Sequence, residues 1–162
     1  ASRYGPKNFL AAEMKLKYYH VCMAVKNATC LDYLKDGWGG IEGKPFVDNS
    51  TKPIKAIRVR CSRYIDSIQL QYAGVWGTPH GGTDGVLHTI ELDKDEWIVG
   101  VEGRSGLYVD KLIFITNKDR VLGGCGGTGG HYFSETAPEG MKLIGISGKS
   151  DKYINRINFI WG

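Results

Sequence analysis

One five-residue pattern occurs three times in this sequence at nearly equal intervals. Each copy has Tyr in third place, a β-branched residue in fourth place and an acid or amide in fifth place. The fifth residues lie 44 positions (110 − 66) and 45 positions (155 − 110) apart. A repeat of this length predicts a fold built from three similar units. The copies are Ser62-Arg63-Tyr64-Ile65-Asp66, Gly106-Leu107-Tyr108-Val109-Asp110 and Asp151-Lys152-Tyr153-Ile154-Asn155.

Strand-forming residues flank each copy. Apolar and β-branched residues at 57–59, 98–101 and 143–146 precede the three copies. After the first copy, Ile68, Leu70 and Tyr72 alternate with polar residues, and similar alternation follows the other two copies. Alternation of period two gives a strand one buried face and one exposed face. Each copy is therefore predicted to be the tip of a β-hairpin.

A glycine-rich pattern, G-G-x-x-G, repeats in step with the first at 39–43, 81–85 and 126–130. We expect one unit to be a Gly-rich hairpin followed by a turn-motif hairpin, which makes four strands. Three four-stranded sheets that each bury one face must pack those faces around a common axis. The sequence thus predicts an all-β, three-sided prism with pseudo-threefold symmetry.

Composition and charge limit the other classes of protein. A chain of 162 residues fits one domain, expected at 36–162, with a cysteine-containing extension at 1–35, in which 9–25 fits either helix or strand. The 21 basic residues are scattered among 17 acidic residues, so nucleic acid is not an expected partner. No apolar run reaches the roughly 20 residues of a membrane-spanning helix, so membrane insertion is not expected.

Several features favour secretion. The chain has two N-x-[ST] sequons, at Asn27 and Asn49, and starts at Ala1 rather than Met, as a processed chain would. Four cysteines allow three intramolecular pairings, all of which stay open, as does a bridge between two chains. The sequence has no C-x-x-C motif, and its four histidines lack metal-binding spacing, so we expect no metal and no cofactor. The disulfide candidates are Cys22, Cys30, Cys61 and Cys125, and the histidines are His20, His80, His88 and His131.

Residues 37–161 resemble the jacalin-related lectin family, including its secreted animal and molluscan members. The likeness rests on Gly37-Trp38-Gly39-Gly40, on Glu96-Trp97-Ile98, and on Gly148-Lys149-Ser150 leading into the third copy. The resemblance implies a β-prism I fold of three Greek-key sheets and metal-independent sugar binding through a G-x-x-x-D turn backed by a Gly-rich loop. In this family a single uncleaved chain goes with mannose and glucose specificity.

The family motif is intact only in the second copy, which runs from Gly106 to Asp110. The first copy opens with Ser62, and the third has lost both the leading Gly and the final Asp. A carboxylate can accept hydrogen bonds from two sugar hydroxyls while turn N–H groups donate. The predicted carbohydrate-binding residues are Gly106, Leu107, Tyr108, Asp110 and Gly130 in a second site, Ser62, Arg63, Tyr64, Asp66 and Gly85 in a first, and Gly43, Asp151, Lys152, Tyr153 and Asn155 in a weaker third.

Two local alternatives remain open. An Asp at the end of a turn often caps the turn through its own backbone, and the three tyrosines either face the sugar or pack in the protein.

The expected function is a secreted, non-enzymatic, multivalent lectin for glucose- or mannose-type sugars and glycoproteins, dimeric through the extension. An extracellular matrix or biomineral-associated structural protein with the same fold is the alternative. Glycosidase chemistry needs two acids, and each site offers one.

Overall fold

The computed structural model describes residues 37–162, which form β-strands joined by turns and loops. The expectations for 9–25, for Cys22, Cys30 and Asn27, and for a dimer through the extension lie outside this range. Residues 37–162 contain no helix that is long and apolar enough to cross a membrane. The strands are β1 (Trp38–Gly39), β2 (Lys44–Asn49), β3 (Ile54–Cys61), β4 (Ile65–Tyr72), β5 (Val75–Trp76), β6 (His80–Gly81), β7 (Val86–Glu91), β8 (Ile98–Ser105), β9 (Val109–Thr116), β10 (Val121–Gly126), β11 (His131–Thr136), β12 (Leu143–Ser150) and β13 (Ile154–Trp161).

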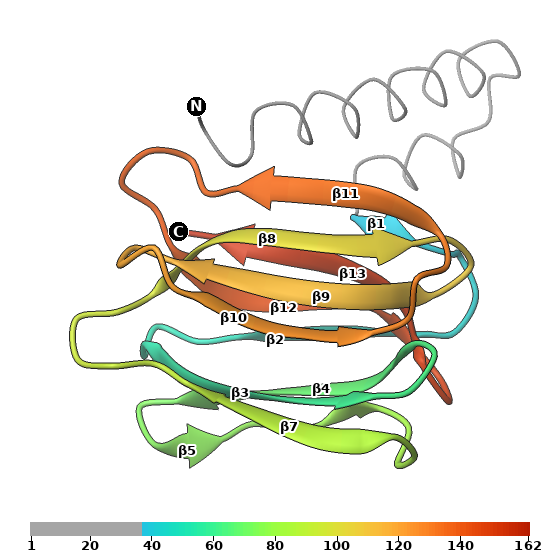
Figure 1. Ribbon diagram of the computed structural model, residues 1–162. Helices are drawn as coiled ribbons and strands as arrows, with labels where there is room; N and C mark the ends of the chain where they lie inside the picture. The colour runs from blue at the N-terminus through green and yellow to red at the C-terminus, as the bar shows by residue number, and fades with distance from the viewer. Residues whose placement is uncertain (1–36) are drawn as a thin grey trace, which may run out of the picture.

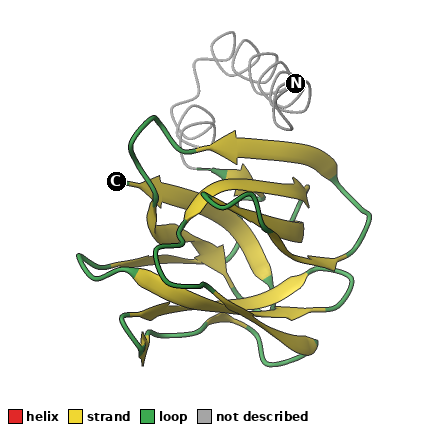
Figure 2. Cartoon of the chain, turned by 60° about the vertical axis from the view of Figure 1, so that its left-hand side comes forward, coloured by secondary structure: helices red, strands yellow, loops and turns green. Residues whose placement is uncertain are grey.

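The strands form three antiparallel sheets around one interior (Figures 1 and 2). Sheet A has the order β1-β13-β12-β2, and sheet C has the order β10-β9-β8-β11. Sheet B has the order β5-β4-β3-β7, and its outer position beside β4 is shared by the two short strands β5 and β6. The all-β, three-sheet prediction is therefore confirmed, with one outer strand split in two.

The predicted composition of one unit was wrong. In sheets B and C the central turn-motif hairpin pairs with the Gly-rich strands that follow it in the chain, not with those that precede it. Sheet A has no strands after its hairpin and takes β1 and β2 from the other end of the domain. A repeating pattern does not reveal where its unit starts. The Gly-rich segments are held to the preceding hairpin because Gly81 and Gly126, at φ of +107° and +121°, lie against the carbonyls of Asp66 and Asp110.

The apolar faces of the central hairpins build the core. Ile68, Leu70 and Tyr72 of β4 point inward, while Gln69 and Gln71 between them are half-buried, as the alternation predicted. The equivalent residues of β9 and β13 are buried in the same cluster. Burial of side chains of this size contributes about 1.5–3 kcal/mol each relative to exposure. This shared core fixes the orientation of the three hairpins and hence of their tips.

Side chains also join the sheets in pairs. Asp48 of sheet A accepts a hydrogen bond from the Tyr72 hydroxyl at 2.6 Å, and its other oxygen lies 2.7 Å from Nε2 of His80, both from sheet B. Burial, followed by the bond to Asp48, raises the pKa of Tyr72 above its ordinary value. Trp38 of sheet A stacks on Phe133 of sheet C with ring centroids 4.8 Å apart.

A disulfide joins sheets B and C. It connects Cys61, the last residue of β3, to Cys125 in β10, with the two Cα atoms 5.9 Å apart. The sequence left this pairing open among three. The bond spans 64 residues of chain, and closing a loop of that length restricts the unfolded state strongly.

Candidate functional site

The three hairpin tips meet at one end of the molecule, at the right of Figure 1. Their tyrosines, Tyr64, Tyr108 and Tyr153, pack against one another with ring centroids 4.7, 4.9 and 5.1 Å apart. The rings are half-buried and tilted or edge-on to one another, as aromatic pairs prefer. Of the two roles considered for the tyrosine rings, the geometry favours packing, and the three turns surround this aromatic cluster.

All three turns have the same internal hydrogen bond. The N–H of the first residue donates to the carbonyl of the third, from Ser62 to Tyr64 at 2.9 Å, with equivalents at 2.8 Å in the second turn and 2.9 Å in the third. The N–H groups of the second and third turn residues, such as Arg63 and Tyr64, donate to no group within residues 37–162. The third turn keeps this geometry although it has lost the leading Gly.

The fifth residue of each copy is buried beside a glycine. Asp66, Asp110 and Asn155 are 1%, 4% and 4% exposed. A Cβ atom added to Gly85 would lie 2.6 Å from Oδ1 of Asp66, and the matching distances are 2.7 Å for Gly130 and Asp110 and 2.9 Å for Gly43 and Asn155. These glycines have φ of +83°, +70° and +94°. The structure therefore brings each acid or amide together with the loop glycine expected to face it.

The side-chain oxygens of these three buried residues have different surroundings. Neither side-chain oxygen of Asp66, nor Oδ1 of Asn155, has a hydrogen-bond partner within the described chain. Asp66 therefore does not cap its own turn, which removes that alternative for the first site. Burial raises the pKa of Asp110 above its ordinary value, and the positive charge of Arg104 acts in the opposite direction.

One set of site residues was missed by the sequence analysis. A basic residue two positions before each copy donates to the carbonyls of the facing Gly-rich loop. Arg104 makes two such bonds, Nε to Gly129 O at 2.9 Å and Nη2 to Gly130 O at 2.8 Å. Arg60 reaches Gly85 O at 3.4 Å, and Lys149 reaches Ile41 O at 3.0 Å. The signal was present, because all three residues are basic and occupy the same place in the repeat.

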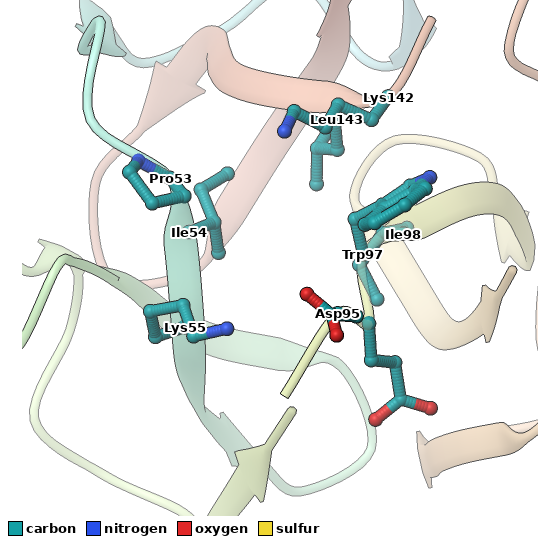
Figure 3. Close-up of a pocket in the computed structure, with 9 residues that line it drawn as sticks. Pro53, Ile54, Lys55, Asp95, Trp97, Ile98, Lys142 and Leu143 are labelled. Atoms are coloured by element: carbon teal, nitrogen blue, oxygen red, sulfur yellow. The ribbon is translucent and has the colours of Figure 1, made fainter. Parts of the chain in front are cut away.

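Two recesses lie on the surface of residues 37–162, and one of them borders the predicted sites. A hollow of about 260 Å³ adjoins the first site along the outer face of sheet B, between Arg58, Arg60, Ser67 and the loop at 81–83. A second recess, of about 210 Å³, lies at the starts of β3, β8 and β12, the opposite end from the turns (Figure 3). Lys55, Asp95, Trp97 and Lys142 surround it, and none of these belongs to the predicted sites.

The one sequon inside the described range is at Asn49. Its side chain is exposed at the end of β2, and the turn that follows carries Thr51 at the surface. An exposed sequon is accessible for modification. Glycosylation of Asn49 stays a prediction.

Solved structures with the same fold are lectins. The prostate-specific WGA16 glycoprotein lectin has a TM-score of 0.68 and 28% identity, over 78% of this chain and 98% of that chain. Artocarpin, solved in complex with mannotriose, has a TM-score of 0.71 and 27% identity, over 78% of this chain and 94% of that one. Together with the three-sheet architecture, these likenesses define the class as β-prism lectins.

The family itself is shown by sequence. Residues 36–160 match the Jacalin-like lectin domain, and the chain belongs to this family of carbohydrate-binding proteins. Zymogen granule membrane protein 16 of Rattus norvegicus is 35% identical over 128 residues, which cover 76% of this chain and 77% of that protein. Jacalin-related lectin 3 of Arabidopsis thaliana is 30% identical over 133 residues, 74% of this chain but 22% of that longer protein. Lectins of this family are non-enzymatic.

Proposed function

We propose that the protein binds glucose- or mannose-type sugars at its hairpin tips. The observation that carries the proposal is the carboxylate of Asp66, which is buried with two unpartnered oxygens. A buried polar group without a partner costs about 1–3 kcal/mol, so such groups are normally satisfied. A sugar offers hydroxyl donors for the carboxylate and oxygen acceptors for the N–H groups of Arg63 and Tyr64. Charge-assisted bonds of this kind are roughly twice as strong as neutral ones.

The choice of sugar class is supported by the relatives. Artocarpin was solved with mannotriose, and the lectin AcmJRL of Ananas comosus, 25% identical with a TM-score of 0.69, is described as mannose-binding. The hollow beside the first site supports binding of oligosaccharides as well as single sugars. Ser67 and Arg60 border this hollow, which has space for a second sugar unit.

We rank the three sites by the group in the fifth position. Asp66 and Asp110 each supply a carboxylate, whereas Asn155 supplies one acceptor oxygen and an NH2 donor. The intact motif of Gly106 to Asp110 favours the second site as the strongest. The unpartnered carboxylate of Asp66 favours the first site instead. Because both tips lie at the same end of the prism, a branched glycan or a glycan-bearing surface would engage both, and linked binding events raise the apparent affinity.

We also propose that the protein is secreted and acts on extracellular glycoproteins. The Cys61–Cys125 disulfide supports this proposal, because disulfides persist in oxidising compartments. The likeness to the prostate-specific WGA16 glycoprotein lectin supports it as well.

A glycan array tests the proposal with four proteins: wild type, Asp66→Ala, Asp110→Ala and the double variant. A millimolar sugar site has only about 4 kcal/mol of binding free energy. Loss of a carboxylate that accepts two hydroxyl bonds should therefore lower affinity at that site by at least tenfold, and the double variant should lose nearly all binding to mannose- and glucose-terminated glycans. Glu139→Ala is the matched control, since it removes an exposed acid from a loop far from the turns.

Two results would contradict different parts of this proposal. If the double variant binds glycans as wild type does, the sites are misplaced. If wild type binds no glycan but adsorbs to matrix or mineral surfaces, the structural-protein alternative replaces the lectin activity. Binding of wild type only to glycans without glucose or mannose would correct the sugar class alone.

A further inference from the structure

The disulfide between sheets B and C has a histidine beside it. Val86 of β7 lies opposite Cys61 in the register of β3 and β7, and His88 lies two residues further along the same strand. Residues two apart on a strand point to the same face of the sheet. One ring nitrogen of His88 and the two sulfur atoms of Cys61 and Cys125 all lie within 4.8 Å of one another.

These three atoms are the donor set that a thiophilic metal ion prefers. Cysteine thiolate and neutral imidazole are the common ligands of Zn²⁺, at roughly 2.3 Å for sulfur and 2.0–2.1 Å for nitrogen. Two sulfur ligands of a tetrahedral zinc ion are therefore about 3.8 Å apart. In the oxidised protein the two sulfurs are bonded to each other, so they must separate to this distance after reduction, and the His88 nitrogen already lies within 4.8 Å of both.

In the oxidised protein both sulfurs are used by the disulfide, which carries no negative charge and is a poor ligand. Exchange with a dithiol reductant breaks the S–S bond and leaves two thiols, while the reductant becomes the disulfide. Binding of a divalent ion then releases the two thiol protons, because the thiolate is the ligand. The disulfide and the metal site thus exclude each other.

The surroundings allow an ion to enter. Cys61 is buried, Cys125 is half-buried and His88 is exposed, so the site opens to solvent on the His88 side. Sequence spacing gave no hint of this arrangement, since the three residues are far apart in the chain and come from β3, β7 and β10.

We propose that the reduced protein binds one Zn²⁺ ion through Cys61, Cys125 and His88. The ion joins sheet B to sheet C in place of the disulfide, and three protein ligands leave a fourth position for water or another ligand. The reduction state of one cysteine pair therefore selects between a covalent and a metal cross-link at the same point of the fold. The three ligands are none of the residues proposed for sugar binding, although Cys61 directly precedes the first turn, and the inference does not depend on that function.

The test uses the full chain with Cys22 and Cys30 changed to serine, so that the only thiols are those of the site. The protein is reduced with a phosphine under anaerobic conditions and titrated with Co²⁺ as a spectroscopic probe, and Zn²⁺ is then added in competition. We expect one Co²⁺ per chain, with thiolate-to-cobalt charge-transfer absorption and tetrahedral d–d bands that Zn²⁺ removes. The oxidised protein should show neither.

His88→Ala should weaken the binding at least about tenfold. His131→Ala, which removes another exposed strand histidine, should leave it unchanged. If reduction loosens the domain, the same comparison is made by thermal unfolding, where Zn²⁺ should raise the midpoint of the parent but not of His88→Ala. The proposal is overturned if no one-to-one complex forms, if His88→Ala binds as tightly as the parent, or if the oxidised protein binds equally well.

Discussion

The α-carbon of Gly127 lies directly against the backbone carbonyl of Arg63: a Cβ atom at Gly127 would lie only 2.2 Å from that oxygen. The contact joins the Gly-rich loop beside Asp110 to the turn of the first site. The same contact recurs between Gly82 and Lys152 and between Gly40 and Leu107. Each loop that borders one site therefore supports the turn of another, and the three sites form a closed ring of backbone contacts.

This ring predicts that one substitution will affect two sites. Gly127→Ala should force the loop and the first turn apart, so sugar binding should weaken at both the first and the second site. The effect is measured by titration calorimetry with methyl mannoside in Asp66→Ala and Asp110→Ala backgrounds, each of which leaves one of the two sites. Gly124→Ala is the control: its Cβ would meet Ile113 only at 3.7 Å, and its φ of +96° adds backbone strain without any contact between a loop and a turn. A loss confined to the second site would show that the ring does not transmit the change.

The glycine beside the first acid should matter for that site alone. Gly85→Ala would place a Cβ 2.6 Å from Oδ1 of Asp66 and should displace the carboxylate, with a tenfold or greater loss of affinity at the first site. Gly74→Ala carries a similar backbone cost, because Gly74 has φ of +89°, but its Cβ would meet nothing within 4 Å. Equal losses of sugar affinity in the two variants would attribute the effect to backbone strain rather than to the site.

Restoring the third acid should create a stronger site. The third turn has the same internal bond as the others, and Oδ1 of Asn155 has no partner within residues 37–162. Asn155→Asp should therefore raise affinity at the third site by about 5–150-fold, the equivalent of 1–3 kcal/mol. Calorimetry in the Asp66→Ala, Asp110→Ala background isolates this site. An unchanged titration would mean that the lost leading Gly limits the third site instead.

Asp110 should contribute to binding at the expense of stability. Burial raises its folded-state pKa, so folding favours the protonated form and ionisation weakens the fold as pH rises through that pKa. Asp110→Asn should unfold at a higher temperature than wild type at pH 7, and the difference should vanish at a pH below the ordinary Asp value. Melting curves at several pH values check this. A lower midpoint at pH 7 would show that the Arg104 charge outweighs the cost of burial.

An ion pair between the buried carboxylate of Glu96 and the partly exposed Arg120 should govern acid unfolding. Arg120 holds Glu96 with two bonds, at 2.7 and 2.8 Å, and lowers the pKa of Glu96 to about 2 from its ordinary value near 4.5. The stability that this shift contributes is present above pH 4.5 and is lost as pH falls from about 5 towards 2. Arg120→Ala leaves the carboxylate of Glu96 buried without its cation and should lower the free energy of unfolding at neutral pH, by less than for a fully buried pair because Arg120 is partly exposed.

Urea unfolding at pH 7 and pH 3 measures this contribution. Arg120→Ala should lose stability at neutral pH and show a shallower decline towards pH 3 than wild type. Lys118→Ala, which removes a nearby cation that makes no bond to Glu96, should keep the wild-type pH profile. Parallel pH profiles for wild type and Arg120→Ala would show that the pair does not control acid stability.

The hairpins and their facing glycines could be predicted because they depend on local repeats. The copies at 62–66 and 106–110 specify the turns, and the spacing to Gly85 and Gly130 specifies the loops that return to them. The contacts across the axis could not be predicted, because they exist only once three sheets have closed. The clustering of Tyr64 with Tyr108 and the pairing of Cys61 with Cys125 are of this kind. Residues that are distant in sequence meet there at positions set by the whole core.

Sheet A imposes an order on synthesis. Among the strands of residues 37–162, its outer strands β1 and β2 leave the ribosome first and their partners β12 and β13 leave it last. Long-range antiparallel pairing of this kind is slow, and unpaired strands are prone to misassociation. A nascent chain must therefore keep β1 and β2 unpaired while sheets B and C are completed. Sheet A, and with it the third turn beside Gly43, can therefore be completed only after all the strands of sheets B and C have been synthesised.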